Sequence, residues 1–202
     1  MKKIIRIFCA FLVISALFSV SASALTYHTV EKGDTLWRIA VKYEVGLSEL
    51  KSVNRDIKNY DLIYPGQKIT IPDRDADEEK FEKEVIRLVN IERRKNGLSD
   101  LKYNWELSRV AGYKSEDMNK RNYFSHTSPT YGTPFEMIRN FGITYRSAGE
   151  NIAKGQKTPE AVVKAWMNSS GHRANILSKS FTEIGVGYVA DGNIWTQLFI
   201  GR

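Results

Sequence analysis

The chain has 202 residues, enough for one or two domains with a sizeable hydrophobic core. Hydrophobic residues make up 42% and charged residues 26%, which is ordinary for a soluble globular protein and excludes a mainly membrane-embedded chain. The formal net charge is +7, and three of the cations lie at the extreme N-terminus.

The N-terminus has the three parts of a secretory signal peptide. Three cations precede an apolar run over residues 7–20, and residues 22–24 (Ala-Ser-Ala) supply a small-residue cleavage pattern. The apolar run is too short to span a membrane, and the cations before it and the cleavage pattern after it are those of a signal peptide. We expect cleavage after Ala24, a net charge of +4 and no transmembrane anchor on the mature chain. Cys9, the only cysteine, lies inside this run, so the mature chain has no disulfide.

Residues 25–72 have the turn, cap and chain-terminating residues of a small separate module. A strand over residues 26–30 is followed by a Gly-Asp turn whose aspartate, Asp34, can cap the next helix. A second helix over residues 48–54 leads to a closing strand that ends at Pro72. This order predicts a β-α-α-β unit.

The segments YHTVEKGDTLWRIAVKY, LSELKSVN and LIYPGQKITIP resemble the LysM module along its whole length. The resemblance implies binding of N-acetylglucosamine-containing glycans, chiefly peptidoglycan, in a shallow groove between two loops. Position by position, that groove would be formed by Gly33, Asp34, Thr35 and Leu36, facing Ile63, Tyr64 and Pro65. Backbone groups would read the acetamido group, and apolar side chains would cover the face of the sugar.

Two further residues of this module have a structural and a functional interpretation. Trp37 could stack on a sugar, but its helical spacing favours a place in the core. His28 has no second metal ligand nearby in the sequence, so we interpret it as structural.

Residues 73–79 form a polar, charged linker, and helices and strands follow it. We predict helices over residues 77–96 and 106–120, the second with Asn104 as its N-cap. A shorter helix begins at Pro134, and another begins at Pro159 with Trp166 in its apolar face. A strand over residues 184–188 and a hairpin around Asp-Gly 191–192 precede the last strand. Glycines in the 184–188 strand allow another backbone to approach closely.

Three motifs occur in order over this second region: YFSHTSP at 123–129, AGENIA at 148–153, and WMNSSGHRANIL with IGVGY at 166–188. Together they resemble the bacterial branch of the CAP superfamily (cysteine-rich secretory proteins, antigen 5, pathogenesis-related proteins). The resemblance assigns residues 80–202 to a CAP domain. It implies an α-β-α sandwich with a small, mainly antiparallel sheet, so the expected fold class of the whole chain is α+β.

The same resemblance implies a cleft lined by His126, Glu150 and His172. The second glutamate of the family pattern falls at Ser169, so this chain has lost one carboxylate. Two imidazoles are good ligands for zinc or a similar divalent ion, with Glu150 as a third ligand or as the group that orients a histidine. The alternative is a polar, hydrogen-bonded cluster that only ties helices to the sheet.

We therefore expect a monomeric, secreted protein of the cell wall or spore envelope, with peptidoglycan or a related glycan as its partner and no nucleic acid. The leading interpretation is a non-enzymatic module that is positioned by its LysM domain. The alternative is a metal-assisted hydrolase of wall or peptide substrates that uses His126, Glu150 and His172.

Overall fold

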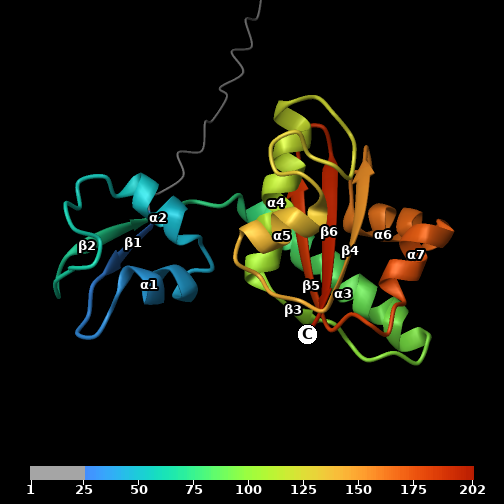
Figure 1. The fold of residues 1–202 in the computed structure, drawn as a ribbon, viewed down its shortest axis with the longest axis horizontal. Helices are drawn as coiled ribbons and strands as arrows, with labels where there is room; N and C mark the ends of the chain where they lie inside the picture. Colours follow the sequence, from blue (N-terminus) through green and yellow to red (C-terminus); the bar gives the residue numbers. More distant parts are fainter. Residues whose placement is uncertain (1–25) are drawn as a thin grey trace, which may run out of the picture.

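The computed structural model describes residues 26–202, so the predicted signal peptide and its cleavage site lie outside the described residues. Within this range, no helix is both long enough and apolar enough to cross a membrane. The chain forms a small N-terminal unit and a larger C-terminal sandwich, joined by a short connection (Figure 1).

The N-terminal unit is the predicted β-α-α-β module. Strands β1 (Thr26–Thr29) and β2 (Lys68–Ile71) pair antiparallel, and helices α1 (Leu36–Lys42) and α2 (Leu47–Val53) lie between them in the chain. Asn54 ends α2, and its side-chain amide donates to the carbonyl of Thr70 and accepts from the N–H of Thr70. The second helix is therefore fixed to the sheet. The core is apolar, with Ile39, Leu50 and Ile69 fully buried.

Helix α3 (Ala76–Lys95) begins one residue earlier than predicted, so its first turn takes up part of the 73–79 segment. Asp75 caps this helix by accepting hydrogen bonds from two backbone N–H groups of its first turn. A free N–H at a helix start is satisfied by such a side chain, which explains why the acidic run becomes helix. The linker is thus reduced to a few residues after Pro72.

Helix α2 also touches the larger unit through a contact that we call the clasp. Glu49 accepts hydrogen bonds from Nε of Arg109 at 2.9 Å and from the hydroxyl of Tyr113. Nearby, Glu44 accepts one from the hydroxyl of Tyr103 at 2.9 Å. Burial and the adjacent Glu49 carboxylate both raise the pKa of Tyr113, so this phenol stays a donor. A cavity of about 470 Å³ lies at the same junction.

The larger unit is built on a four-stranded sheet in the order β3-β5-β6-β4. Its strands are β3 (Lys102–Tyr103), β4 (Ser147–Lys154), β5 (Glu183–Val189) and β6 (Ile194–Gly201). The long strands pair antiparallel, and only the two-residue β3 runs parallel to its neighbour β5. The mixed, mainly antiparallel sheet and the α+β class agree with the expectation.

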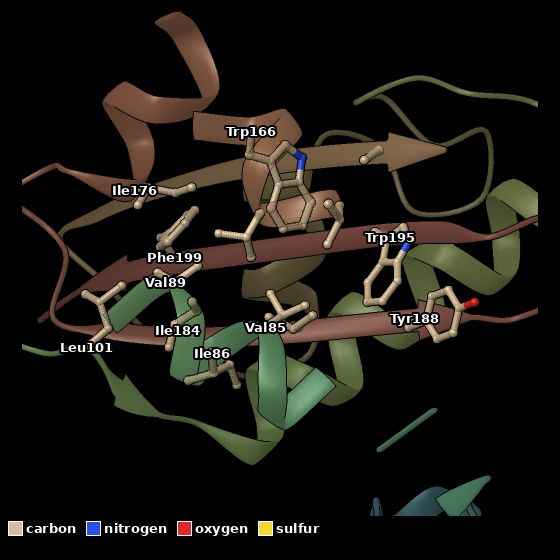
Figure 2. Close-up of a cluster of buried hydrophobic side chains, with 14 of the residues drawn as sticks. Val85, Ile86, Val89, Leu101, Trp166, Ile176, Ile184, Tyr188, Trp195 and Phe199 are labelled. Carbon is tan, nitrogen blue, oxygen red and sulfur yellow. The ribbon is translucent and has the colours of Figure 1, made fainter. Parts of the chain in front are cut away.

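Helices cover both faces of this sheet, as Figure 1 shows. Helices α3, α6 (Pro159–Asn168) and α7 (Ser170–Ile176) cover one face, and α4 (Trp105–Lys120) and α5 (Pro134–Asn140) cover the other. Alternate residues of a strand point to opposite faces. Accordingly, Trp195 and Phe199 of β6 join the first core, while Leu198 joins the second. Figure 2 shows the first core, with Trp166 of α6 above the sheet.

Helix α4 lies unusually close to β5, as the glycines of that strand predicted. A Cβ on Gly185 would lie 2.3 Å from the backbone N of Ser108, and one on Gly187 would lie 2.1 Å from the backbone N of Gly112. No side chain fits at these two points, so helix and strand meet backbone to backbone. Asn104 caps α4 by accepting a hydrogen bond from the N–H of Leu107, as predicted.

Trp166 provides a test of the core. It is only 1% exposed, so Trp166→Ala should lower the free energy of unfolding by about 3–5 kcal/mol through lost burial and a cavity. Urea unfolding measures this. Trp37, which is 53% exposed, is the matched control, and Trp37→Ala should change the free energy of unfolding by about 0.5 kcal/mol or less. Equal losses for the two variants would contradict this assignment of the core.

Candidate functional site

His126 and Glu150 form a direct pair. Nδ1 of His126 donates to Oε1 of Glu150 at 2.6 Å, with the imidazole 57% exposed and the carboxylate side chain 2% exposed. The hydrogen bond to Glu150 raises the pKa of His126 above its ordinary value, against a smaller opposing effect of burial. Because Nδ1 is engaged, Nε2 is the ring nitrogen that remains for a ligand.

Two residues of α4 hold the loop that carries His126. Lys114 is 1% exposed, and its Nζ donates to the backbone carbonyl of His126 at 2.6 Å. Asp117 accepts hydrogen bonds from the hydroxyls of Tyr123, Ser128 and Thr130, at 2.6 to 2.7 Å. The loop is therefore fixed on both sides of the histidine by side chains from one helix.

Strand β4 also contacts the segment that carries the second histidine. Consecutive residues of a strand point to opposite faces, so Glu150 faces the His126 loop while Asn151 faces α7. The Asn151 side chain donates to the backbone carbonyl of His172 at 3.1 Å and accepts from Asn175 at 2.8 Å. Asn151 therefore braces the backbone at His172 from β4.

His172 lies at the start of α7. Burial lowers the pKa of its imidazole, and the nearby His126 charge lowers it further. The neutral form is thus favoured at His172, and the two rings are close enough to interact electrostatically. Ser169, at the position of the missing glutamate, is the N-cap residue between α6 and α7, without a capping side-chain hydrogen bond. The structure therefore pairs His126 with Glu150 directly, whereas His172 is linked to them only through an electrostatic effect of His126, and no acid stands at position 169.

The residues present can be tested against a divalent ion. Within residues 26–202, no three histidine, cysteine, aspartate or glutamate side chains lie together in an arrangement that would hold a metal. One carboxylate oxygen of Glu150 holds His126, while Oε2 is buried and has no hydrogen-bond partner among the described residues. Among the described residues, His126, Glu150 and His172 therefore do not form a three-ligand metal site, and Glu150 orients the ring of His126 instead.

Sequence reasoning missed Lys114. The buried residues of α4 include Leu107, Val110, Ala111, Lys114, Ser115 and Met118, at spacings of three and four residues. A lysine at a core position of a helical repeat was the available signal, because lysine is almost never fully buried unless its charge is paired. Burial lowers the pKa of Lys114, and the carboxylates of Glu150 and Asp117 act in the opposite direction.

The N-terminal module has the second candidate site, a pocket of about 200 Å³ between two loops. Four of the predicted groove residues line it: Asp34, Thr35, Leu36 and Ile63. Gly33, Tyr64 and Pro65 are not among its lining residues in the described structure. The pocket also includes Trp37, Leu47, Lys51, Tyr60 and Asp61, which the sequence did not assign to the groove.

Two interpretations of this module need correction. Trp37 is 53% exposed rather than part of the core, because the buried face of α1 consists of Leu36, Ile39 and Ala40. The helix is capped by Thr35, whose hydroxyl accepts from the N–H of Arg38, and not by Asp34.

His28 is structural, as predicted. Its Nε2 lies 2.8 Å from Oδ2 of Asp34, and its Nδ1 lies 3.2 Å from the hydroxyl of Tyr43. Asp34 also accepts a hydrogen bond from the N–H of Glu31 at 2.8 Å. A buried imidazole thus holds the loop that forms one side of the pocket.

The two site histidines should titrate on opposite sides of pH 6.5, with His126 above and His172 below. The protonated His126 pair stabilises the fold fully below about pH 6.5, and this contribution is lost as pH rises through its folded pKa. The neutral His172 contribution is lost as pH falls. Imidazole resonances followed by NMR against pH measure both values. Glu150→Gln should lower the pKa of His126 and leave that of His172 below 6.5, whereas coincident titrations would contradict the geometry.

Comparison with known proteins agrees with this architecture. The model of the cysteine-rich secretory protein family matches residues 86–200, and that of the LysM domain matches residues 28–72. In solved structures, the chain resembles an extracellular protein containing a SCP domain from Bacillus anthracis. That likeness has 34% identity and a TM-score of 0.60, and it covers 68% of this chain and 47% of that one.

Curated relatives match different shares of this chain, from 80% for the uncharacterized membrane protein YlbC of Bacillus subtilis, at 34% identity, to less than a quarter. The uncharacterized protein YkwD of Bacillus subtilis is 63% identical over 122 residues, which is 60% of this chain and 48% of YkwD. The N-acetylmuramoyl-L-alanine amidase sle1 of Staphylococcus aureus is 37% identical over 70 residues, 35% of this chain and 20% of the amidase. The chain spans about half the length of the first curated relatives that it matches. It belongs to the cysteine-rich secretory protein family and carries a LysM domain ahead of the family's own domain.

Proposed function

We propose that this chain is an exported protein that attaches to peptidoglycan through its LysM domain and there presents the His126–Glu150–His172 site of its CAP domain. The observation that carries the proposal is the 200 Å³ pocket, because it joins the two loops that a LysM groove requires. The match to the LysM domain model supports it. The similarity to an enzyme that is named as an N-acetylmuramoyl-L-alanine amidase also supports a wall setting.

The CAP site would hold a divalent ion, most simply zinc, through Nε2 of His126 and a ring nitrogen of His172. Two observations support this: Glu150 fixes the ring of His126 through Nδ1, and burial favours the neutral, ligating form of His172. Such an ion would supply a Lewis acid with positions free for water or a ligand. Two protein ligands give a weaker site than the three or four that are usual for zinc.

Wall attachment can be tested with a matched pair of neighbouring residues. Ile63 lines the pocket, whereas Leu62 is 51% exposed and does not line it. Ile63→Glu should reduce the fraction of the full chain that sediments with purified peptidoglycan, because a carboxylate would face the sugar's apolar surface. Leu62→Glu should sediment like the unaltered chain. Equal sedimentation of all three proteins would contradict binding in this pocket.

The single groove is small, so its affinity for a soluble fragment should be weak, and the polymer should retain the protein by rebinding at many sites. Competition of sedimentation by soluble muropeptides measures this difference. If micromolar soluble muropeptide abolished sedimentation of the protein with peptidoglycan, the groove would instead be a tight, specific site.

Metal binding can be tested by calorimetry on the full chain, freed of metal, with zinc as the titrant. Protons compete for the imidazole nitrogens, so uptake at about pH 7.5 should exceed uptake at about pH 5.5. Replacing His126 and His172 together by alanine should remove most of the binding. Glu150→Gln should weaken it less than the loss of either histidine, because Glu150 acts on His126. Equal uptake by the unaltered chain and the double variant would leave only a structural polar cluster.

A further inference from the structure

The net charge of the chain is concentrated in one short stretch. Residues 151–182 contain one acid, Glu160, and five cations: Lys154, Lys157, Lys164, Arg173 and Lys179. Their balance of +4 equals the net charge of the whole chain after Ala24, so the other residues of that chain are neutral together. Cations that gather in this way produce a local positive field that the same charges would not produce if they were spread evenly.

These five cations are all exposed, and we call the surface that they form the basic face. The ammonium groups of its four lysines make no hydrogen bond or ion pair within residues 26–202, whereas Arg173 donates to the carbonyl of Met167 at 3.0 Å. In α3, by contrast, lysine and arginine side chains pair with glutamates three or four residues away. Glu160, the one acid of the stretch, lies near Arg87 of α3, and the two line a surface pocket together. The lysines of the basic face are therefore available to an external anion.

The basic face lies on the side of the CAP domain that is turned away from the LysM domain. Lys154 ends β4, and Lys157 lies in the loop before α6. Lys164 is an exposed residue of α6, Arg173 belongs to α7, and Lys179 follows α7. Figure 1 shows α6 and α7 at the side of the sandwich opposite the N-terminal unit. A glycan bound by the LysM domain would therefore leave the basic face open.

The basic face has cations without exposed apolar side chains. The large hydrophobic residues that are exposed in the described chain all lie outside residues 151–182. A helix that binds a membrane surface combines cations with apolar side chains that enter the lipid. Cations alone attract a hydrated polyanion through charge, with no apolar surface to insert. A water-soluble polyanion is thus the partner that fits this face.

We propose that the basic face binds an anionic, phosphodiester-linked polymer of the cell wall, of the teichoic acid type. Each phosphodiester carries a negative charge, and a lysine ammonium binds phosphate as a point charge that needs no fixed geometry. A flexible polymer can therefore meet several lysines at once. As with other polyelectrolytes, binding would release counterions and so would weaken as salt is added. The inference goes beyond the proposed function and takes from it the wall setting alone.

Two preparations of Gram-positive cell wall provide the test: walls that keep their phosphodiester polymer, and walls stripped of it with hydrofluoric acid. In a sedimentation titration at low salt, the full chain should bind the polymer-bearing walls about tenfold more tightly, the size expected for a few phosphate contacts. This difference should largely disappear at high salt, because salt screens exposed charges and removes the gain from counterion release.

A variant without the four lysines tests the basic face itself: Lys154→Gln, Lys157→Gln, Lys164→Gln and Lys179→Gln. It should bind both preparations equally and should bind stripped walls as the unaltered chain does. Arg173 is kept because its side chain also holds the carbonyl of Met167. The matched control removes the same charge from four exposed lysines elsewhere in the domain: Lys80→Gln, Lys95→Gln, Lys102→Gln and Lys120→Gln. The control should keep the preference for polymer-bearing walls.

Three outcomes would overturn the proposal. The first is equal binding of the unaltered chain to both preparations, and the second is an equal loss of preference in the lysine variant and its control, which would indicate net charge alone. The third is a lack of preference between the walls together with lysine-dependent binding to phosphatidylglycerol vesicles, which would indicate a membrane partner. Ile63→Glu should lose binding to stripped walls and keep the preference for polymer, so the proposed function and this inference can fail separately.

Discussion

Helix α4 and strand β5 meet without side chains between them at Gly185 and Gly187, and this contact sets the position of everything that α4 carries. A methyl group at either glycine would overlap backbone atoms of α4, so even alanine would force the helix away from the sheet. The buried side of α4 then reaches the His126 loop through Lys114, and its outer side reaches the LysM domain through Arg109. The CAP site and the domain junction therefore depend on one close approach.

The CAP site depends on charge as much as on packing. Lys114 is a buried cation, and a buried charge is costly unless it is paired and hydrogen-bonded. It has the carbonyl of His126 as an acceptor, with the carboxylates of Glu150 and Asp117 nearby. The loop is held by these hydrogen bonds as well as by the apolar packing of Tyr123 and Tyr131, and such networks fix a geometry closely only when every member is present.

Local sequence rules predicted the elements better than the site. The cap at Asn104 and the buried Trp166 follow from capping chemistry and helical periodicity, and both are confirmed. The meeting of His126 and Glu150, 24 residues apart, followed only from family resemblance, because no periodicity links a loop to a strand. Trp37 was placed wrongly because α1 has only seven residues, too few for its spacing to separate a buried face from an exposed one.

The clasp has a consequence for how the protein would move on a surface. Leu47 and Lys51 of helix α2 line the 200 Å³ pocket, and Glu49 of the same helix contacts α4. One short helix therefore takes part in both the pocket and the junction between the domains. A long flexible linker would let the CAP domain take many positions around a LysM domain that is fixed in place. Here a connection of a few residues and a hydrogen-bonded junction hold the CAP domain in one orientation relative to the pocket of the LysM domain. A glycan bound by the LysM domain, as proposed, would therefore meet the CAP domain at one fixed distance and orientation.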